Sequence, residues 1–183
     1  MRLTLMVPGA TGGTRRSVFG DTTEPVAADP RRTRPGAVIV CAPEPACVRT
    51  AETVAGMTGG LAIADRLSGP DFGRWAGLTA EQVMERDAAG LRRWLRDPQA
   101  RPHGGESLVD HLARVAELLD TFEWPDAGAV IVAPAFTVRA ACVHALRAGP
   151  ESLLHLDLTP GTTAAISRNG DTWRLTSILP GGR

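Results

Sequence analysis

The stretch "AVIVAPAFTVRAACVHALRAG", residues 129–149, decides the fold class of this chain. Its first five residues form an unbroken apolar run, which is typical of a strand buried on both faces of a parallel sheet. The residues from 137 onward predict a helix that closes on Gly149, because glycine is the common residue just past a helix end. A strand that leads directly into a helix indicates an α/β protein.

Two more apolar runs lie upstream, at residues 3–7 and 37–41. The second precedes "EPACVRTAETVAGM", residues 44–57, where Pro45 lies near the predicted start of a helix. The glycine pair at 59–60 follows its predicted end. A second strand and helix are therefore expected here.

The middle and the tail of the chain also carry local signals. Thr79 and Gln82 have the spacing of a capping box, which predicts a helix over 79–90. Residues 106–122 place apolar side chains on one helical face. The tail, residues 153–178, predicts strands around turns, with a hairpin at Asn169–Gly170. We expect a single domain over 1–183, a layered α/β/α fold with a mostly parallel central sheet.

The composition excludes several classes of function. Basic and acidic residues number 20 each, so we expect no nucleic-acid partner. All the basic residues are Arg, and the absence of Lys excludes Schiff-base chemistry and a Lys-bearing phosphate loop. The three cysteines form no Cys-x-x-Cys pair, which argues against a disulfide framework and a thiolate zinc site. We expect a cytoplasmic protein with no membrane segment, metal or cofactor.

Five segments in order along the chain resemble those of the histidine phosphatase superfamily, the phosphoglycerate mutase-like proteins. They are "LTLMVPGAT" (3–11), "TAETVAG" (50–56), "DFGRWAGLTAEQV" (71–83), "PHGGESLVDHLARV" (102–115) and "VIVAPAFTVRAACVHAL" (130–146). The resemblance covers essentially the whole chain and implies the fold of that superfamily.

The resemblance also implies a phosphate site with a nucleophilic His, a second His or acid as proton donor, and two Arg that bind phosphoryl oxygens. In this chain those positions carry other residues, namely Val7, Pro8, Ala46, Gly69 and Pro134. Further substrate contacts fall near Thr14 and Val18, where Arg15 or Arg16 is within reach of the expected pocket. Losing the nucleophile removes the covalent route, so phosphatase or mutase activity is predicted to be absent.

The loop "RPHGGES", residues 101–107, holds the strongest remaining polar candidates. His103 and Glu106 near a helix start would suit acid/base work or a metal ion with a third ligand. The alternative is that Glu106 and Ser107 cap the helix. Asp71 lies close to the lost proton-donor position and is either a displaced acid or a turn former.

Other candidates have equally plain structural explanations. Cys47 either faces the pocket or is an inert small side chain. Arg139 and Arg49 either add anion affinity or are exposed helix charges. We expect His111 and His144 at the surface or core edge of helices, and His155 as a solvent-facing strand residue.

Three hypotheses of function follow. The first is a degenerate phosphatase that binds a small molecule or a protein partner. The second is an enzyme of changed chemistry that uses Glu106, Asp71 or His103, and the third is a phosphomonoester hydrolase by another route. "PHGGES" and "PAFTVRAA" resemble a degenerate subgroup associated with cobalt uptake and cobamide metabolism. The apolar segment "LLHLDL", residues 153–158, would permit a homodimer if it formed a sheet edge.

Overall fold

The computed structural model describes residues 1–21, 23, 38–55 and 61–181. Ala37, the first residue of the predicted second strand, and the glycine pair at 59–60 lie outside the described residues. Six described strands form one sheet in the order β3-β2-β4-β1-β5-β6. They are β1 (Arg2–Met6), β2 (Val38–Cys41), β3 (Leu61–Ile63), β4 (Ala129–Val132), β5 (Thr163–Asn169) and β6 (Thr172–Leu179).

The parallel part of the sheet is built from the apolar runs that the sequence shows. β4 pairs in parallel with both β1 and β2, and β2 pairs in parallel with β3. All four residues of β4 are buried, as expected for a strand covered on both faces. β5 and β6 complete the sheet as an antiparallel hairpin beside β1, so the sheet is mostly parallel as predicted.

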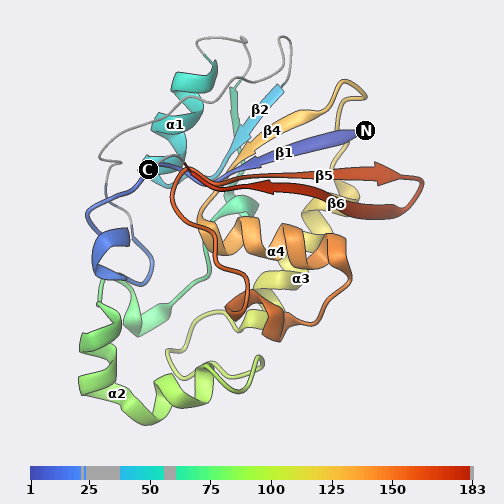
Figure 1. The fold of residues 1–183 in the computed structure, drawn as a ribbon. Helices are drawn as coiled ribbons and strands as arrows, with labels where there is room; N and C mark the ends of the chain where they lie inside the picture. The colour runs from blue at the N-terminus through green and yellow to red at the C-terminus, as the bar shows by residue number, and fades with distance from the viewer. Residues whose placement is uncertain (22, 24–37, 56–60, 182–183) are drawn as a thin grey trace.

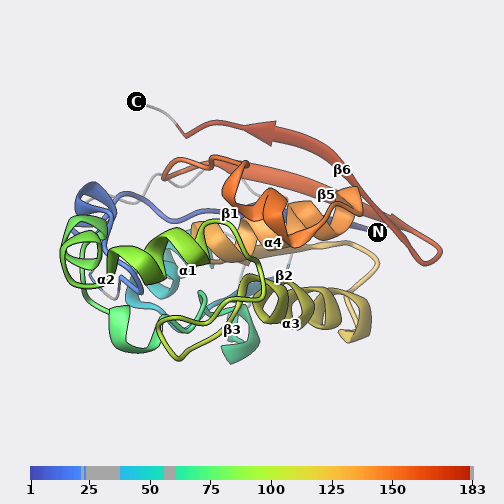
Figure 2. The ribbon, with the colours of Figure 1, turned by 90° about the horizontal axis from the view of Figure 1, so that it is seen from below.

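Helices cover both faces of the sheet and give the predicted α/β/α layers (Figure 1). α1 (Pro45–Ala55) lies on one face, and α3 (Leu108–Thr121) and α4 (Ala135–Leu146) lie together on the other. α2 (Ala80–Trp94) lies apart from the sheet, beyond the carboxyl end of β1. Figure 2 shows this arrangement from below. Among the described residues no helix is long and apolar enough to span a bilayer.

The helix ends confirm one prediction and correct another. Thr79 caps α2 in a full capping box with Gln82, as expected. Gly149 is not the left-handed residue after α4, because the helix ends earlier, and Arg147 adopts that conformation with φ 54°. The glycine instead precedes a short 3-10 helix, η4 (Pro150–Leu154).

The tail forms its hairpin but not all of its predicted strands. β5 and β6 pair from Asn169–Thr172 outward, which confirms the turn. "LLHLDL" is not a strand: Leu153 and Leu158 bury their side chains from η4 and the loop that follows. His155 is exposed, but it lies in a turn. The segment is therefore no sheet edge, and the structural basis expected for a homodimer there is absent.

Candidate functional site

Parallel pairing brings three strand ends to one edge of the sheet. Met6, Cys41 and Val132 lie level in β1, β2 and β4. The next residues stay in register, because Ala133 N donates to the Met6 carbonyl at 3.1 Å and Ala42 N donates to the Val132 carbonyl at 2.9 Å. Ligands of open α/β sheets bind at this carboxyl edge.

The residues that follow these strand ends, on the loops at this edge, include four apolar ones at the positions that the family resemblance singles out. Val7 and Pro8 are buried, Ala46 is buried in the first turn of α1, and Pro134 precedes α4. Backbone bonds tie the end of β1 to the loop before β5, since Gly161 N donates to the Pro8 carbonyl at 3.1 Å. None of these four side chains can act as a nucleophile, acid or anion clamp.

Glu44 is the ionisable residue at this edge that sequence reasoning missed. Its Oε1 accepts a 2.7 Å hydrogen bond from the backbone N–H of Gly69. A Cβ placed on Gly69 would lie 3.6 Å from that oxygen and 3.7 Å from the Pro134 ring. The carboxylate of Glu44 thus lies beside two of the positions that the resemblance singled out. The sequence offers one signal for this role of Glu44, namely its position two residues before Ala46 in the loop that follows a buried strand.

The thiols close to Glu44 are inert. Cys41 and Cys47 are buried, and burial raises the pKa of Cys41 to about 11, with the negative charge of Glu44 adding to the effect. The pKa of Cys47 is raised further by the same two causes. Both thiols therefore stay protonated at neutral pH, which is the structural alternative predicted for Cys47.

Glu106 is engaged in a largely buried ion pair. Both of its carboxylate oxygens accept 2.8 Å hydrogen bonds from Arg114, in a bidentate arrangement. His111 Nδ1 lies 3.5 Å from Glu106 Oε2, and its ring is fully buried rather than at the surface or core edge as predicted. Burial by itself would raise the pKa of Glu106, but the bonds and charges of Arg114 and His111 hold it well below its ordinary value. The group is thus a poor general acid.

The same arginine holds the loop that leads to Gly69. Arg114 donates to the carbonyls of Arg66 at 2.7 Å and of Ser68 and Gly69 at 3.2 Å. Ser107, not Glu106, caps α3, in a capping box with Asp110. The predicted capping role is therefore confirmed for the serine alone.

His103 lies away from Glu106, among aromatic rings. Its ring centroid is 4.9 Å from that of Trp75 and 5.9 Å from that of Phe72. Nδ1 accepts a hydrogen bond from Gly105 N at 3.0 Å, and Nε2 is buried without a partner among the described residues. Burial lowers the pKa of His103, so the imidazole is neutral at pH 7.

Close approach of the backbone explains why the loops around residues 71–73 and 103–105 contain glycine. Gly73 has φ 45°, and a Cβ on it would lie 2.9 Å from Gly105 N. A Cβ on Gly105 would overlap the Asp71 carbonyl oxygen, which accepts a hydrogen bond from Glu106 N at 2.8 Å. Asp71 Oδ1 accepts from Gly73 N at 2.8 Å, the contact of a turn former.

A pocket of about 600 Å³ is lined in part by Ser68 and Gly69 of the same loop. Its ionisable lining is four carboxylates and two guanidinium groups, from Asp65, Asp71, Glu106, Asp110, Arg101 and Arg114. Both guanidinium groups are paired, Arg101 with Asp110 and Arg114 with Glu106. The pocket therefore has an excess of negative charge.

The other predicted arginines have local partners. Arg16 is exposed in η1 (Thr14–Arg16) and donates to the Gly12 carbonyl at 3.3 Å. Arg139 pairs with Asp157 at 3.1 Å and lies over the Phe136 ring.

The remaining candidates are placed as follows. Arg49 is exposed and lies 3.8 Å from Glu52 within α1. Thr14 bonds to Thr11 within its own loop, and His144 lies 3.2 Å from Asp120. Among the described residues no three His, Cys, Asp or Glu side chains gather as metal ligands would.

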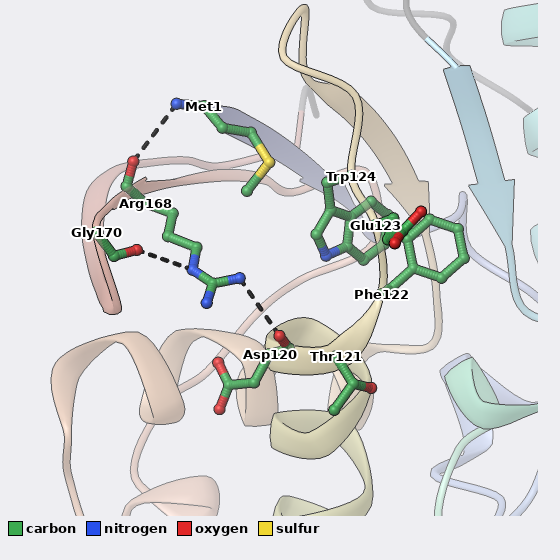
Figure 3. A pocket seen from close by; sticks show the side chains of 8 residues that line it. All are labelled: Met1, Asp120, Thr121, Phe122, Glu123, Trp124, Arg168 and Gly170. Atoms are coloured by element: carbon green, nitrogen blue, oxygen red, sulfur yellow. Dashed lines mark hydrogen bonds between the residues drawn. The ribbon is translucent and has the colours of Figure 1, made fainter.

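A second pocket, of about 480 Å³, lies at the opposite edge of the sheet near Met1 (Figure 3). Arg168 lines this pocket, and its guanidinium group donates hydrogen bonds to the carbonyls of Gly170 at 3.1 Å and Asp120 at 3.4 Å. The Asp120 carboxylate accepts from Trp173 Nε1 at 2.8 Å. The guanidinium group of Arg168 and the carboxylate of Asp120 are therefore already bonded within the protein.

Comparison with known proteins agrees with the architecture. The model of the histidine phosphatase superfamily (branch 1) matches residues 26–179. The chain belongs to this superfamily. Because the match spans most of the described sheet and helices, the family resemblance noted in the sequence is confirmed.

Three relatives indicate where the chain lies among known proteins. The bifunctional protein Rv2228c of Mycobacterium tuberculosis is 34% identical over 139 residues, which cover 73% of this chain and 38% of that relative. A mycobacterial glucosyl-3-phosphoglycerate phosphatase solved with VO3 has a TM-score of 0.79 at 25% identity, covering 99% of both chains.

A putative α-ribazole-5′-P phosphatase from Escherichia coli has a TM-score of 0.83 at 20% identity, covering 100% of this chain and 98% of its own. At that identity the likeness concerns the fold. The two solved structures are described as phosphatases, whereas the edge of the sheet in this chain carries Pro8, Ala46 and Pro134.

Proposed function

We propose that this protein is a catalytically degenerate member of the histidine phosphatase superfamily that binds a small molecule at the carboxyl edge of its sheet without transferring a phosphoryl group. The observation that carries the proposal is the convergence of apolar residues at the edge where β1, β2 and β4 end. These residues are Val7, Pro8, Ala46 and Pro134, beside Gly69.

Phosphoryl transfer needs a nucleophile and cationic donors for the oxygens of the transferred group. Proline, valine and alanine provide neither. The described residues place the carboxylate of Glu44 at this edge, and its negative charge repels a phosphate dianion instead of binding it. The geometry therefore supports binding of another class of ligand.

The contacts of the polar loops do not favour the enzyme of changed chemistry. Glu106 accepts two hydrogen bonds from Arg114, and His103 is buried against Trp75. Asp71 caps a turn at Gly73. Each group serves local structure, so we do not assign acid/base roles to them. The cobalt or cobamide context stays a prediction from the sequence.

Hydrolysis of phosphomonoesters tests the proposal directly. The purified chain is assayed with phosphoserine, glucosyl-3-phosphoglycerate, α-ribazole 5′-phosphate and p-nitrophenyl phosphate across pH 4–9, with and without divalent metal. A variant carrying Val7→Arg, Pro8→His, Ala46→Arg and Pro134→His serves as the matched reconstruction. We expect no turnover above background by the natural chain.

Two results would count against the proposal. Turnover of any ester by the natural chain, lost in the Glu106→Gln variant, would support the third hypothesis with a different catalytic route. Turnover that survives in Glu106→Gln but disappears in Asp71→Asn would assign the chemistry to the other carboxylate. Activity in the reconstruction alone would support the proposal, because it would show an intact scaffold that lacks only its catalytic groups.

A further inference from the structure

Two arginines at the end of α2 have no carboxylate partner among the described residues. Arg92 and Arg96 are exposed and form no ion pair there, whereas Arg93 between them lies 3.9 Å from Asp97. The Asp97 N–H donates to the Arg93 carbonyl at 2.9 Å, so the chain stays helical to this point and Arg96 lies one turn after Arg92. The two unpaired charges therefore leave the same face of the helix.

The same helix face carries an apolar side chain and projects from the molecule. Leu95 is 50% exposed, and it lies between Arg92 and Arg96 at the spacing of one helical face, whereas Leu91 and Trp94 are buried on the other side. α2 lies at the end of the molecule away from the sheet (Figure 1). An apolar contact flanked by charges is the arrangement of a small protein interface.

The pocket of about 600 Å³ has the opposite charge. It is lined by four carboxylates, of which Arg101 and Arg114 pair with one each. The other two belong to Asp65 and Asp71, which are exposed and have no guanidinium partner in the part of the chain that the structure describes. The hollow therefore has two unpaired negative charges, and the projecting helix has two unpaired positive ones.

This match favours a second copy of the chain as the partner. No ion pair joins the two sets of charges within one molecule, as far as the described residues go. The chain carries 20 basic and 20 acidic residues, so two copies have no net charge with which to repel each other. An anionic partner of another kind would pair the helix and leave the pocket unpaired, whereas a second copy satisfies both surfaces.

We infer that copies of this chain associate with one another, the end of α2 of one copy docking in the acidic pocket of the next. Arg92 and Arg96 pair there with Asp65 and Asp71 of the other copy, and Leu95 contacts the rim of the pocket. Unlike charges on the two surfaces steer the encounter and fix its orientation. The inference goes beyond the proposed function and does not rest on it, because neither set of side chains belongs to the apolar edge of the sheet.

Sedimentation equilibrium of the full chain measures the association. The average mass is followed over a range of protein concentrations in about 50 mM and about 1 M NaCl, where the Debye length falls to about 3 Å. At low salt we expect the average mass to rise with concentration above that of one chain. At high salt it should return towards the mass of one chain, because the exposed charges are screened.

Two charge-reversed variants locate the interface. Arg92→Glu with Arg96→Gln makes the helix face negative, and Asp65→Arg with Asp71→Asn makes the pocket positive while keeping an acceptor for the Gly73 N–H. Each variant alone should associate at least about tenfold more weakly than the natural chain. An equimolar mixture of the two should associate again, because a reversed helix then meets a reversed pocket. If the pocket variant fails to fold, Asp65→Arg alone replaces it.

Arg15→Gln with Arg16→Glu is the matched control, since it makes the same change of net charge on η1, outside both surfaces, and should leave the association unchanged. Circular dichroism of each variant separates loss of association from loss of fold. A natural chain that stays monomeric at every concentration, equal weakening by the control, or a mixture that associates no better than its components would overturn the inference. Turnover of a phosphomonoester contradicts only the proposed function.

Discussion

Arg114 binds Glu106 through two hydrogen bonds of 2.8 Å and, with the same guanidinium group, holds the carbonyls of Arg66, Ser68 and Gly69. One side chain of α3 therefore fixes both the start of its own helix and the loop that carries Gly69 to Glu44. The carboxylate that the sequence offered as a catalytic acid serves as the counter-charge for this arrangement.

Removing Arg114 should lower the stability of the folded protein strongly. In Arg114→Leu, Glu106 keeps its charge in a site where its side chain is only 16% exposed, and breaking such a pair costs about 3–5 kcal/mol. We expect the free energy of unfolding, from chemical denaturation, to fall by that order. Glu117→Gln removes an exposed ion pair with Arg66 and should cost about 0–1 kcal/mol. Equal losses in the two variants would contradict this role of Arg114.

The stability of the protein should depend on pH through Glu106. Its pKa in the folded chain lies well below the ordinary value of 4.5, because the bonds and charges of Arg114 and His111 outweigh burial. A depressed folded pKa means that the unfolded chain binds the proton more readily, so the stabilisation is complete above about pH 4.5 and is lost as pH falls below it.

Thermal unfolding between pH 3 and pH 7 measures this effect. The midpoint of the natural chain should fall with acidification more steeply than that of Glu106→Gln, which has no proton to bind at this position. Identical slopes would show that Glu106 is not the group responsible.

Alanine at Gly105 should destabilise the protein through a backbone clash. Its Cβ would overlap the Asp71 carbonyl oxygen, which bonds to Glu106 N and has little freedom to move. We expect a loss of about 2–3 kcal/mol in the free energy of unfolding. Gly12→Ala is the control, since a Cβ there meets no atom within 4 Å and should change stability by less than about 0.5 kcal/mol. A neutral Gly105→Ala would mean that the two loops are not packed as described.

The three cysteines should be unreactive in the native protein. All are buried, and burial raises the pKa of Cys41 to about 11 and that of Cys142 to about 12. Reaction with a thiol-specific disulfide reagent at pH 8 should therefore be slow in buffer and complete in denaturant. Rapid modification of one equivalent in the folded protein, located by mass spectrometry, would contradict the burial of that thiol and reopen a chemical role for Cys47.

Much of the fold is visible in the sequence because it depends on local patterns. The apolar runs at 3–7 and 129–133 became β1 and β4, and the capping box of Thr79 and Gln82 formed as predicted. Burial on both faces demands unbroken apolar runs, and a cap needs partners only three residues apart. The apolar residues at the carboxyl edge of the sheet, from Pro8 to Pro134, are also visible in the sequence, because the family resemblance singles out those positions.

The tertiary structure decided which polar groups lie at that edge and which do not. Glu44 meets Gly69 across 25 residues of sequence, and Arg114 meets Gly69 across 45. His103 and Glu106 are three residues apart, yet one packs into an aromatic cluster and the other pairs with α3. Residue types and spacing determine helices, strands and caps, whereas the partner of a carboxylate or an imidazole depends on which distant segments pack against it, and only the folded chain determines that.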